Sequence, residues 1–254
     1  MDMVRFIFLT ALKTLGLIFL GLLAAKAVSG LSAGEAGKKL SWLQRVAYAL
    51  IVGLAALNAY NLGNDIAAAN YAWASQRNLA QSQFDKAYSN ARRAVELRPG
   101  VTDYWEALAD AKFSQHQFAS MIADLPVFLA LGSGRLNETF GFRLASAHFL
   151  LGQYDKVIPV TQQMIQANPA YTAPYVLEGY ARLAQKKFPE AQRLFLAVLQ
   201  KDPNHQAAVE GLAHTYFLAG DRARSLAVLA ETSKFSFSAP ARQRFEALKG
   251  LYGQ

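Results

Sequence analysis

The chain of 254 residues contains no cysteine, which excludes disulfide bonds, thiolate zinc sites and cysteine nucleophiles. Its four histidines have no partner four residues away and no acidic cluster beside them, so the sequence predicts no metal site. The net charge is +8, but lysine and arginine never form a run longer than two residues, which argues against nucleic-acid binding. No arrangement of residues resembles a catalytic site. We therefore predict a protein that is not an enzyme and that has no cofactor.

Two long apolar runs lie within residues 1–63. Residues 6–25 contain a single charge, Lys13, and as a helix they would span about 30 Å, the thickness of a hydrocarbon core. Residues 46–62 contain no charge and would span about 25 Å. The sequence thus predicts that residues 1–63 form a membrane anchor of two transmembrane helices. A cleaved secretion signal, with its processing site near Ala25, is the alternative for the first run.

The segment between the two runs is basic, with four lysine or arginine residues and one glutamate. Positively charged loops stay in the cytoplasm, so two spans would place everything after residue 63 on the opposite side of the membrane. In a bacterium, this prediction corresponds to the inner (cytoplasmic) membrane, with the C-terminal part of the chain in the periplasm.

Beyond residue 63, an aromatic residue recurs at a nearly constant interval, at Phe84, Phe118, Tyr154 and Phe188. A proline follows three of these aromatics by fifteen residues, and small side chains recur at two further positions of the same period. A fixed period of this length is typical of stacked helix pairs. Each proline marks the end of a second helix, because it lacks the amide hydrogen and disfavours a helical residue before it. The prolines are Pro99, Pro169 and Pro203.

This pattern resembles the tetratricopeptide repeat (TPR), a helix–turn–helix unit of about 34 residues, as found in membrane-anchored bacterial proteins. The resemblance implies an all-α fold: an N-terminal transmembrane helical hairpin followed by an α-solenoid of about five repeats within residues 64–254. Pro126 lies inside the second helix of the second repeat and predicts a kink, followed by a longer turn around Gly132 to Gly134. When each proline is set at repeat position 32, the repeats are 68–101, 102–137, 138–171, 172–205 and 206–239, and a capping helix follows at about 240–250.

The resemblance also implies a concave groove, lined by positions 2, 5, 9, 12 and 13 of the first helix of each repeat. In this chain those positions give an acidic entrance and an apolar, aromatic trough. Such a surface is typical of interaction sites, and an amphipathic helix is its natural ligand. Burial of Phe149, Leu183 and Phe217 between neighbouring helices is the alternative explanation for these three apolar residues. The candidate groove residues are Asp103, Glu106, Asp110, Phe113, Phe142, Phe149, Tyr180, Leu183, His214 and Phe217.

These features predict a membrane-anchored scaffold that binds protein partners, with a role in the periplasmic assembly of a complex or a secreted protein. Its predicted topology resembles that of the TPR subunit of cytochrome c maturation, although the loop between the two runs is much shorter here. Two alternatives remain open. One is a structural subunit of a larger membrane complex, and the other is an accessory protein of polysaccharide or O-antigen export.

Overall fold

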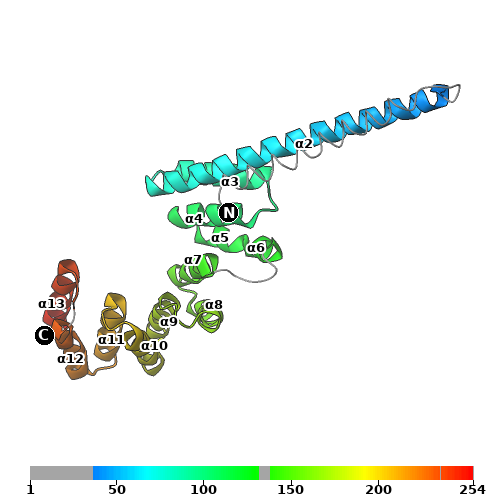
Figure 1. Ribbon diagram of the computed structural model, residues 1–254. Helices are drawn as coiled ribbons and strands as arrows, with labels where there is room; N and C mark the ends of the chain where they lie inside the picture. The colour runs from blue at the N-terminus through cyan, green and yellow to red at the C-terminus, as the bar shows by residue number, and fades with distance from the viewer. Residues whose placement is uncertain (1–36, 132–137, 235, 254) are drawn as a thin grey trace. The chain divides into compact units, whose positions relative to one another are not determined.

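The computed structural model describes residues 37–131, 138–234 and 236–253. Within these ranges every regular element is a helix, which confirms the predicted all-α fold (Figure 1). The chain divides into two compact units, residues 1–111 and 112–254. Each unit contains its own clusters of buried apolar side chains.

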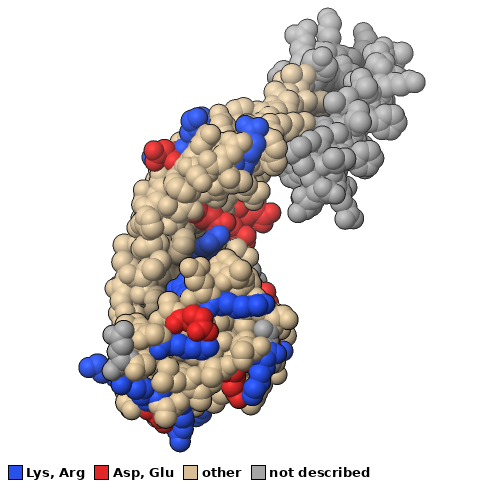
Figure 2. Space-filling view, turned by 90° about the vertical axis from the view of Figure 1, so that its left-hand side faces the viewer, with Lys and Arg blue, Asp and Glu red and all other residues tan. Residues whose placement is uncertain are grey.

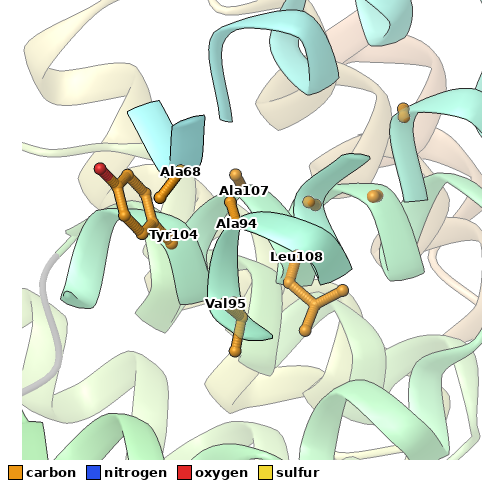
Figure 3. Packing of buried hydrophobic residues seen from close by; sticks show 9 residues of the cluster. Ala68, Ala94, Val95, Tyr104, Ala107 and Leu108 are labelled. Atoms are coloured by element: carbon orange, nitrogen blue, oxygen red, sulfur yellow. The ribbon is translucent and has the colours of Figure 1, made fainter. Parts of the chain in front are cut away.

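The first unit is built on α2, a helix of 44 residues from Gly37 to Ala80. α3 (Phe84–Leu97) packs along the C-terminal half of α2, and α4 (Thr102–Ser114) contributes further residues to the same core (Figure 1). Most of the core side chains are alanines, which let the three helices approach one another closely (Figure 3). The buried residues are Ala68, Ala87, Ala91, Ala94, Val95, Tyr104, Ala107, Leu108 and Ala111.

The part of α2 that lies before residue 61 extends beyond α3 (Figure 1), and six large apolar side chains between Val46 and Tyr60 are exposed there. Packing of α2 against the end of α3 begins where Arg98 donates hydrogen bonds to the carbonyl oxygen of Asn61 and to the carboxylate of Asp65. In the described part of the chain, no helix combines the length and the apolarity that a membrane crossing requires. The predicted second span, residues 46–62, lies within α2, and the predicted first span, residues 6–25, lies outside the described residues.

The second unit stacks helix pairs in chain order. Each helix from α7 to α12 contacts the next one along the chain, and α12 contacts α13. The first helices of successive pairs also contact one another, α7 with α9, α9 with α11 and α11 with α13. This pattern is that of a TPR-like solenoid. The helices are α5 (Phe118–Ala123), α6 (Leu125–Leu131), α7 (Glu138–Leu150), α8 (Tyr154–Ala167), α9 (Ala173–Ala184), α10 (Phe188–Lys201), α11 (Gln206–Leu218), α12 (Arg222–Glu231), η1 (Thr232–Lys234) and α13 (Ala239–Gly253).

The turn between the two helices of a pair has the same backbone geometry in all five repeats. One residue adopts a positive φ, between 57° and 85°, and the amide of the following residue donates to a carbonyl five residues earlier. This is the helix-ending geometry that a left-handed residue provides. The second helix then begins directly, so that each recurring aromatic residue is the first residue of a helix. The positive-φ residues are Ser82, His116, Gly152, Lys186 and Gly220.

The second helices end where the recurring prolines predict. Arg98, Asn168 and Asp202 follow the last helical residue, with φ of −142°, −141° and −136°, and a proline comes next in each case. The predicted kink at Pro126 appears as a complete break between α5 and α6. At this break the carboxylate of Asp124 pairs with the buried ammonium group of Lys112, 2.5 Å away. The predicted longer turn at 132–134 lies outside the described residues.

Candidate functional site

The candidate groove residues are divided between the two units. Asp103, Glu106 and Asp110 lie on the part of α4 that belongs to the first unit. Asp103 is exposed, whereas Glu106 and Asp110 are half-buried. The other seven candidates belong to the second unit.

Two candidates, Phe113 and Phe142, are half-buried and have polar or aromatic neighbours. The ring of Phe113 contacts Phe118 edge-on, with ring centroids 5.2 Å apart, and the guanidinium of Arg143 lies 5.3 Å from its centroid. The ring of Phe142 lies 6.2 Å from that of Tyr171. Arg143 follows Phe142 on α7, so this helix contributes both an aromatic ring and a cation to the same region.

Two further candidates are packing residues. Leu183 is only 6% exposed and belongs to a core cluster with Phe195 and Leu212. Phe149 is half-buried against a second cluster, and its ring contacts that of Tyr154 edge-on at 5.4 Å. Leu183 therefore does not line an exposed groove. The alternative explanation, burial between helices, accounts for it.

Tyr180 connects α9 to α11. Its hydroxyl donates to the carbonyl oxygen of Ala207, 2.9 Å away in the first turn of α11, and its ring contacts Phe195 edge-on. Burial, assisted by the nearby charge of Glu210, raises the pKa of Tyr180 to about 12. The hydroxyl thus stays protonated at neutral pH, as a hydrogen-bond donor must.

His214 and Phe217, the two candidates on α11, are covered by Tyr252 of α13. The Tyr252 hydroxyl lies 2.6 Å from Nδ1 of His214, and its ring stacks on Phe217 with 4.2 Å between centroids. Burial lowers the pKa of His214, which favours the neutral imidazole. Burial raises the pKa of Tyr252 in the same way. The end of the capping helix is therefore part of this surface.

An ion pair completes the surface on α11 and α13. The carboxylate of Glu210 accepts a hydrogen bond from Gln206 and pairs with Arg244 at 3.2 Å. The Arg244 side chain is 66% exposed, whereas that of Glu210 is 15% exposed. We name Tyr180, Glu210, His214, Arg244 and Tyr252 the polar cluster.

Sequence reasoning found Tyr180 and His214 but missed the contribution of α13. Arg244 lies one repeat period after Glu210, so extending the repeat register through the capping helix would have identified it. The exposed group of this cluster is the Arg244 cation, whereas Tyr252 is 2% exposed and its hydroxyl lies against His214. In the described residues, no group of histidine, aspartate and glutamate side chains is arranged to hold a metal ion.

Residues 182–248 match the family model of the tetratricopeptide repeat. The solved structure of MamA from Desulfovibrio magneticus RS-1, residues 41 to the end, is similar with a TM-score of 0.60 and 17% identity, covering 66% of this chain and 93% of that one. YrrB, described as a TPR protein with an unusual peptide-binding site, has a TM-score of 0.56 and 17% identity, covering 70% and 90%. TTC0263, a TPR protein of Thermus thermophilus, has a TM-score of 0.54 and 16% identity, covering 71% and 98%.

A comparison with curated protein sequences gave no match. The family match covers residues 182–248, a minority of the chain. At 16–17% identity, the likenesses to solved structures show the fold alone.

Proposed function

We propose that this chain is a non-enzymatic scaffold that binds a polypeptide partner through the first helices of its second unit. The observation that carries the proposal is the row formed by α7, α9, α11 and α13, in which each helix contacts the next. YrrB, a protein of the same fold, is described as having a peptide-binding site, which supports this class of function. Stacked repeats offer an extended surface of this kind to their partners.

The chemistry of the surface favours an amphipathic helical segment as the partner. Phe142 and Tyr171 provide aromatic contacts for its apolar side chains. Arg143 and Arg244 provide cations for acidic side chains on its flanks, and Arg244 is the more accessible because two thirds of its side chain is exposed. The aromatic residues would supply most of the affinity, since buried aromatic anchors dominate most interfaces.

Lys and Arg side chains alternate with Asp and Glu over the face shown in Figure 2. A nucleic-acid binder gathers its basic residues on one face. The mixture of charges instead suits a protein partner whose own charges vary along its length.

We also propose that the chain is anchored in a membrane, with its repeats on the periplasmic side of the inner membrane of a bacterium. The support is the exposed part of α2, where residues 49–57 are all apolar or glycine. A helix that is apolar all round is normally buried in protein or in lipid. The exposed large side chains are Val46, Leu50, Val52, Leu54, Leu57 and Tyr60.

The same exposed part of α2 favours a second candidate function, that of a structural subunit in a larger membrane complex. In that case the apolar side chains would contact the helices of other subunits. Purification from native membranes distinguishes the two functions. A scaffold for assembly co-purifies with secretory polypeptides, whereas a structural subunit co-purifies with integral partners in a fixed stoichiometry.

Two variants test the proposed binding surface, Phe142→Ser and Arg244→Ser, alone and combined. We expect the combined variant to lose the partners that the wild-type protein captures from native membranes, as quantified by mass spectrometry. Trp73→Ser is the control, because Trp73 is a 55% exposed aromatic residue in the first unit, outside the proposed surface. Unchanged capture by the combined variant, with its helical circular dichroism intact, would show that this surface is not the binding site.

Orientation has an independent test. A reporter that fluoresces only in the cytoplasm is fused to the C-terminus of the full chain, and the protein is extracted with alkaline carbonate. We expect no fluorescence and retention in the membrane pellet. Bright fluorescence would refute the periplasmic placement, and release by carbonate would refute the membrane anchor.

A further inference from the structure

A cavity of about 390 Å³ lies between α10, α11 and α12, away from the polar cluster. Its size is in the range of ligand sites in proteins. The lining is mostly apolar, with a glutamate at one side. The lining residues used below are Pro203, Val209, Leu212, Tyr216, Val228 and Glu231.

In two other repeats, an aromatic side chain of the protein itself is hydrogen-bonded to the carbonyl oxygen of the corresponding proline. The hydroxyl of Tyr175 donates to the carbonyl oxygen of Pro169, 3.3 Å away, and the indole N–H of Trp105 donates to that of Pro99, 2.8 Å away. In both repeats the aromatic residue follows the proline by six positions. Val209 follows Pro203 by the same six positions. Where the second and fourth repeats carry a ring with a polar hydrogen, the fifth repeat carries only the valine side chain.

Two further positions of these helices carry charged side chains in the fourth repeat and uncharged ones in the fifth. Glu178 and Arg182 form a buried ion pair on α9, and Glu178 also accepts a hydrogen bond from Thr161. One repeat period later, the equivalent positions on α11 are Leu212 and Tyr216, which line the cavity. The space beside Pro203 is therefore lined by a leucine and a tyrosine where the fourth repeat has an ion pair.

We propose that this cavity binds a tyrosine or tryptophan side chain of a partner polypeptide. The ring occupies the space beside Val209, and its O–H or N–H donates to the carbonyl oxygen of Pro203, as Tyr175 and Trp105 do in their own repeats. The carboxylate of Glu231 at the cavity pairs with Lys234 at 3.3 Å, so a lysine or arginine next to the aromatic residue of the partner would compete with Lys234 for this carboxylate. In the fourth repeat a cation also lies beside the ring, since the ammonium of Lys201 is 4.0 Å from the centroid of Tyr175.

The polypeptide nature of the partner rests on the proposed function, but the cavity itself is tested with small molecules. The full chain is placed in lipid nanodiscs with its leucine and valine methyl groups labelled, and p-cresol, the tyrosine side chain, is titrated. We expect saturable NMR shifts at the methyl groups of Val209, Leu212 and Val228. Toluene has the same shape without the hydroxyl, and it should bind about 3- to 10-fold more weakly, the ratio that one hydrogen bond provides.

Val209→Tyr supplies the missing ring from within the chain. We expect this variant to lose the saturable shifts and to unfold at a higher temperature than the wild type. Leu218→Tyr is the control, since it adds the same ring to α11 at an exposed residue that does not line the cavity. If Val209→Tyr does not fold, Val228→Phe reduces the same cavity from α12. Equal binding of p-cresol and toluene, or saturable shifts that persist in the filled variant, would overturn the proposal.

Partner capture separates this proposal from the broader function. Loss of capture in both Val209→Tyr and the Phe142 and Arg244 variant supports a partner that uses both surfaces. Capture that survives in Val209→Tyr but not in the other variant overturns the role of the cavity and leaves the scaffold function intact.

Discussion

Replacing Gly211 by alanine should destabilise the second unit because of a single buried ring. A Cβ atom at residue 211 would lie 2.4 Å from two ring carbons of Phe195, and a Cβ at Gly179 would lie 2.8 Å from the same two atoms. Phe195 is completely buried. The ring thus lies close to two glycines on neighbouring helices and cannot move away from one without approaching the other.

The expected magnitude follows from two opposing effects. Alanine is favoured over glycine in a helix by about 1 kcal/mol, whereas forcing an extra carbon into a packed core costs about 1–3 kcal/mol after the structure adjusts. At 2.4 Å no adjustment of a flexible chain end relieves the contact. Because this contact places the packing cost near the upper end of its range, we expect Gly211→Ala to lower the free energy of unfolding by a net of about 1–2 kcal/mol, measured by urea unfolding followed by circular dichroism.

The matched control is Gly250→Ala on α13, where a Cβ would meet no atom within 4 Å. It should be neutral or stabilising by up to about 1 kcal/mol. A second test combines Gly211→Ala with Phe195→Leu, which removes the far end of the ring. The double variant should lose less stability than the sum of the two single changes, with a coupling of about 1–2 kcal/mol. If Gly211→Ala behaves like the control, Phe195 does not lie between the two glycines.

Two further predictions concern the turns and the polar cluster. Gly152 has a φ of +70° with open space around it, so Gly152→Ala should lower the free energy of unfolding by about 1–2 kcal/mol from backbone strain alone. The control is Gly100→Ala, where there is also open space but no positive φ, and it should change the urea midpoint little. Because burial raises the pKa of Tyr180 to about 12 from a usual value of 10, the native state holds this proton more tightly than the unfolded state. The contribution of this raised pKa to the free energy of unfolding is complete below pH 10 and declines by about 2–3 kcal/mol as the pH rises to 12. Tyr180→Phe should remove that part of the pH dependence in unfolding titrations. Equal slopes of stability against pH in both proteins would contradict this prediction.

The sequence was sufficient to predict the helical architecture, because its signals are local. A proline disfavours a helical residue before it, so the prolines that recur with the repeat period located the ends of α3, α8 and α10 without tertiary information. Pro159 lies inside α8, so a proline outside that register does not end a helix. Near Pro126 the helix is interrupted at Asp124, whereas Leu125, directly before the proline, is helical. The recurring aromatic residues and small side chains then predicted the stacking, since a helix pair cannot bury its own apolar face.

The candidate site was less predictable because it depends on which side chains the neighbouring helices cover. Leu183 and His214 lie at positions that the TPR resemblance assigns to the same surface, but Leu183 is buried in the core and His214 is bonded to Tyr252. The turn residues Ser82, His116 and Lys186 adopt positive φ without a glycine to indicate it. Their conformation is imposed by the two flanking helices, and no local signal in the sequence reports it.

Differences between repeats are more informative about function than the features that the repeats share. Shared features, such as the turn geometry of all five repeats, are required by stacking in every unit, so they cannot distinguish one binding surface from another. Where one repeat lacks a side chain that packs inside another repeat, the fold still forms. The space and the carbonyl group that this side chain would have contacted then remain. Val209, in the position of Tyr175, creates such a place beside Pro203. Partner recognition in a stacked array is therefore best sought where the repeats depart from one another.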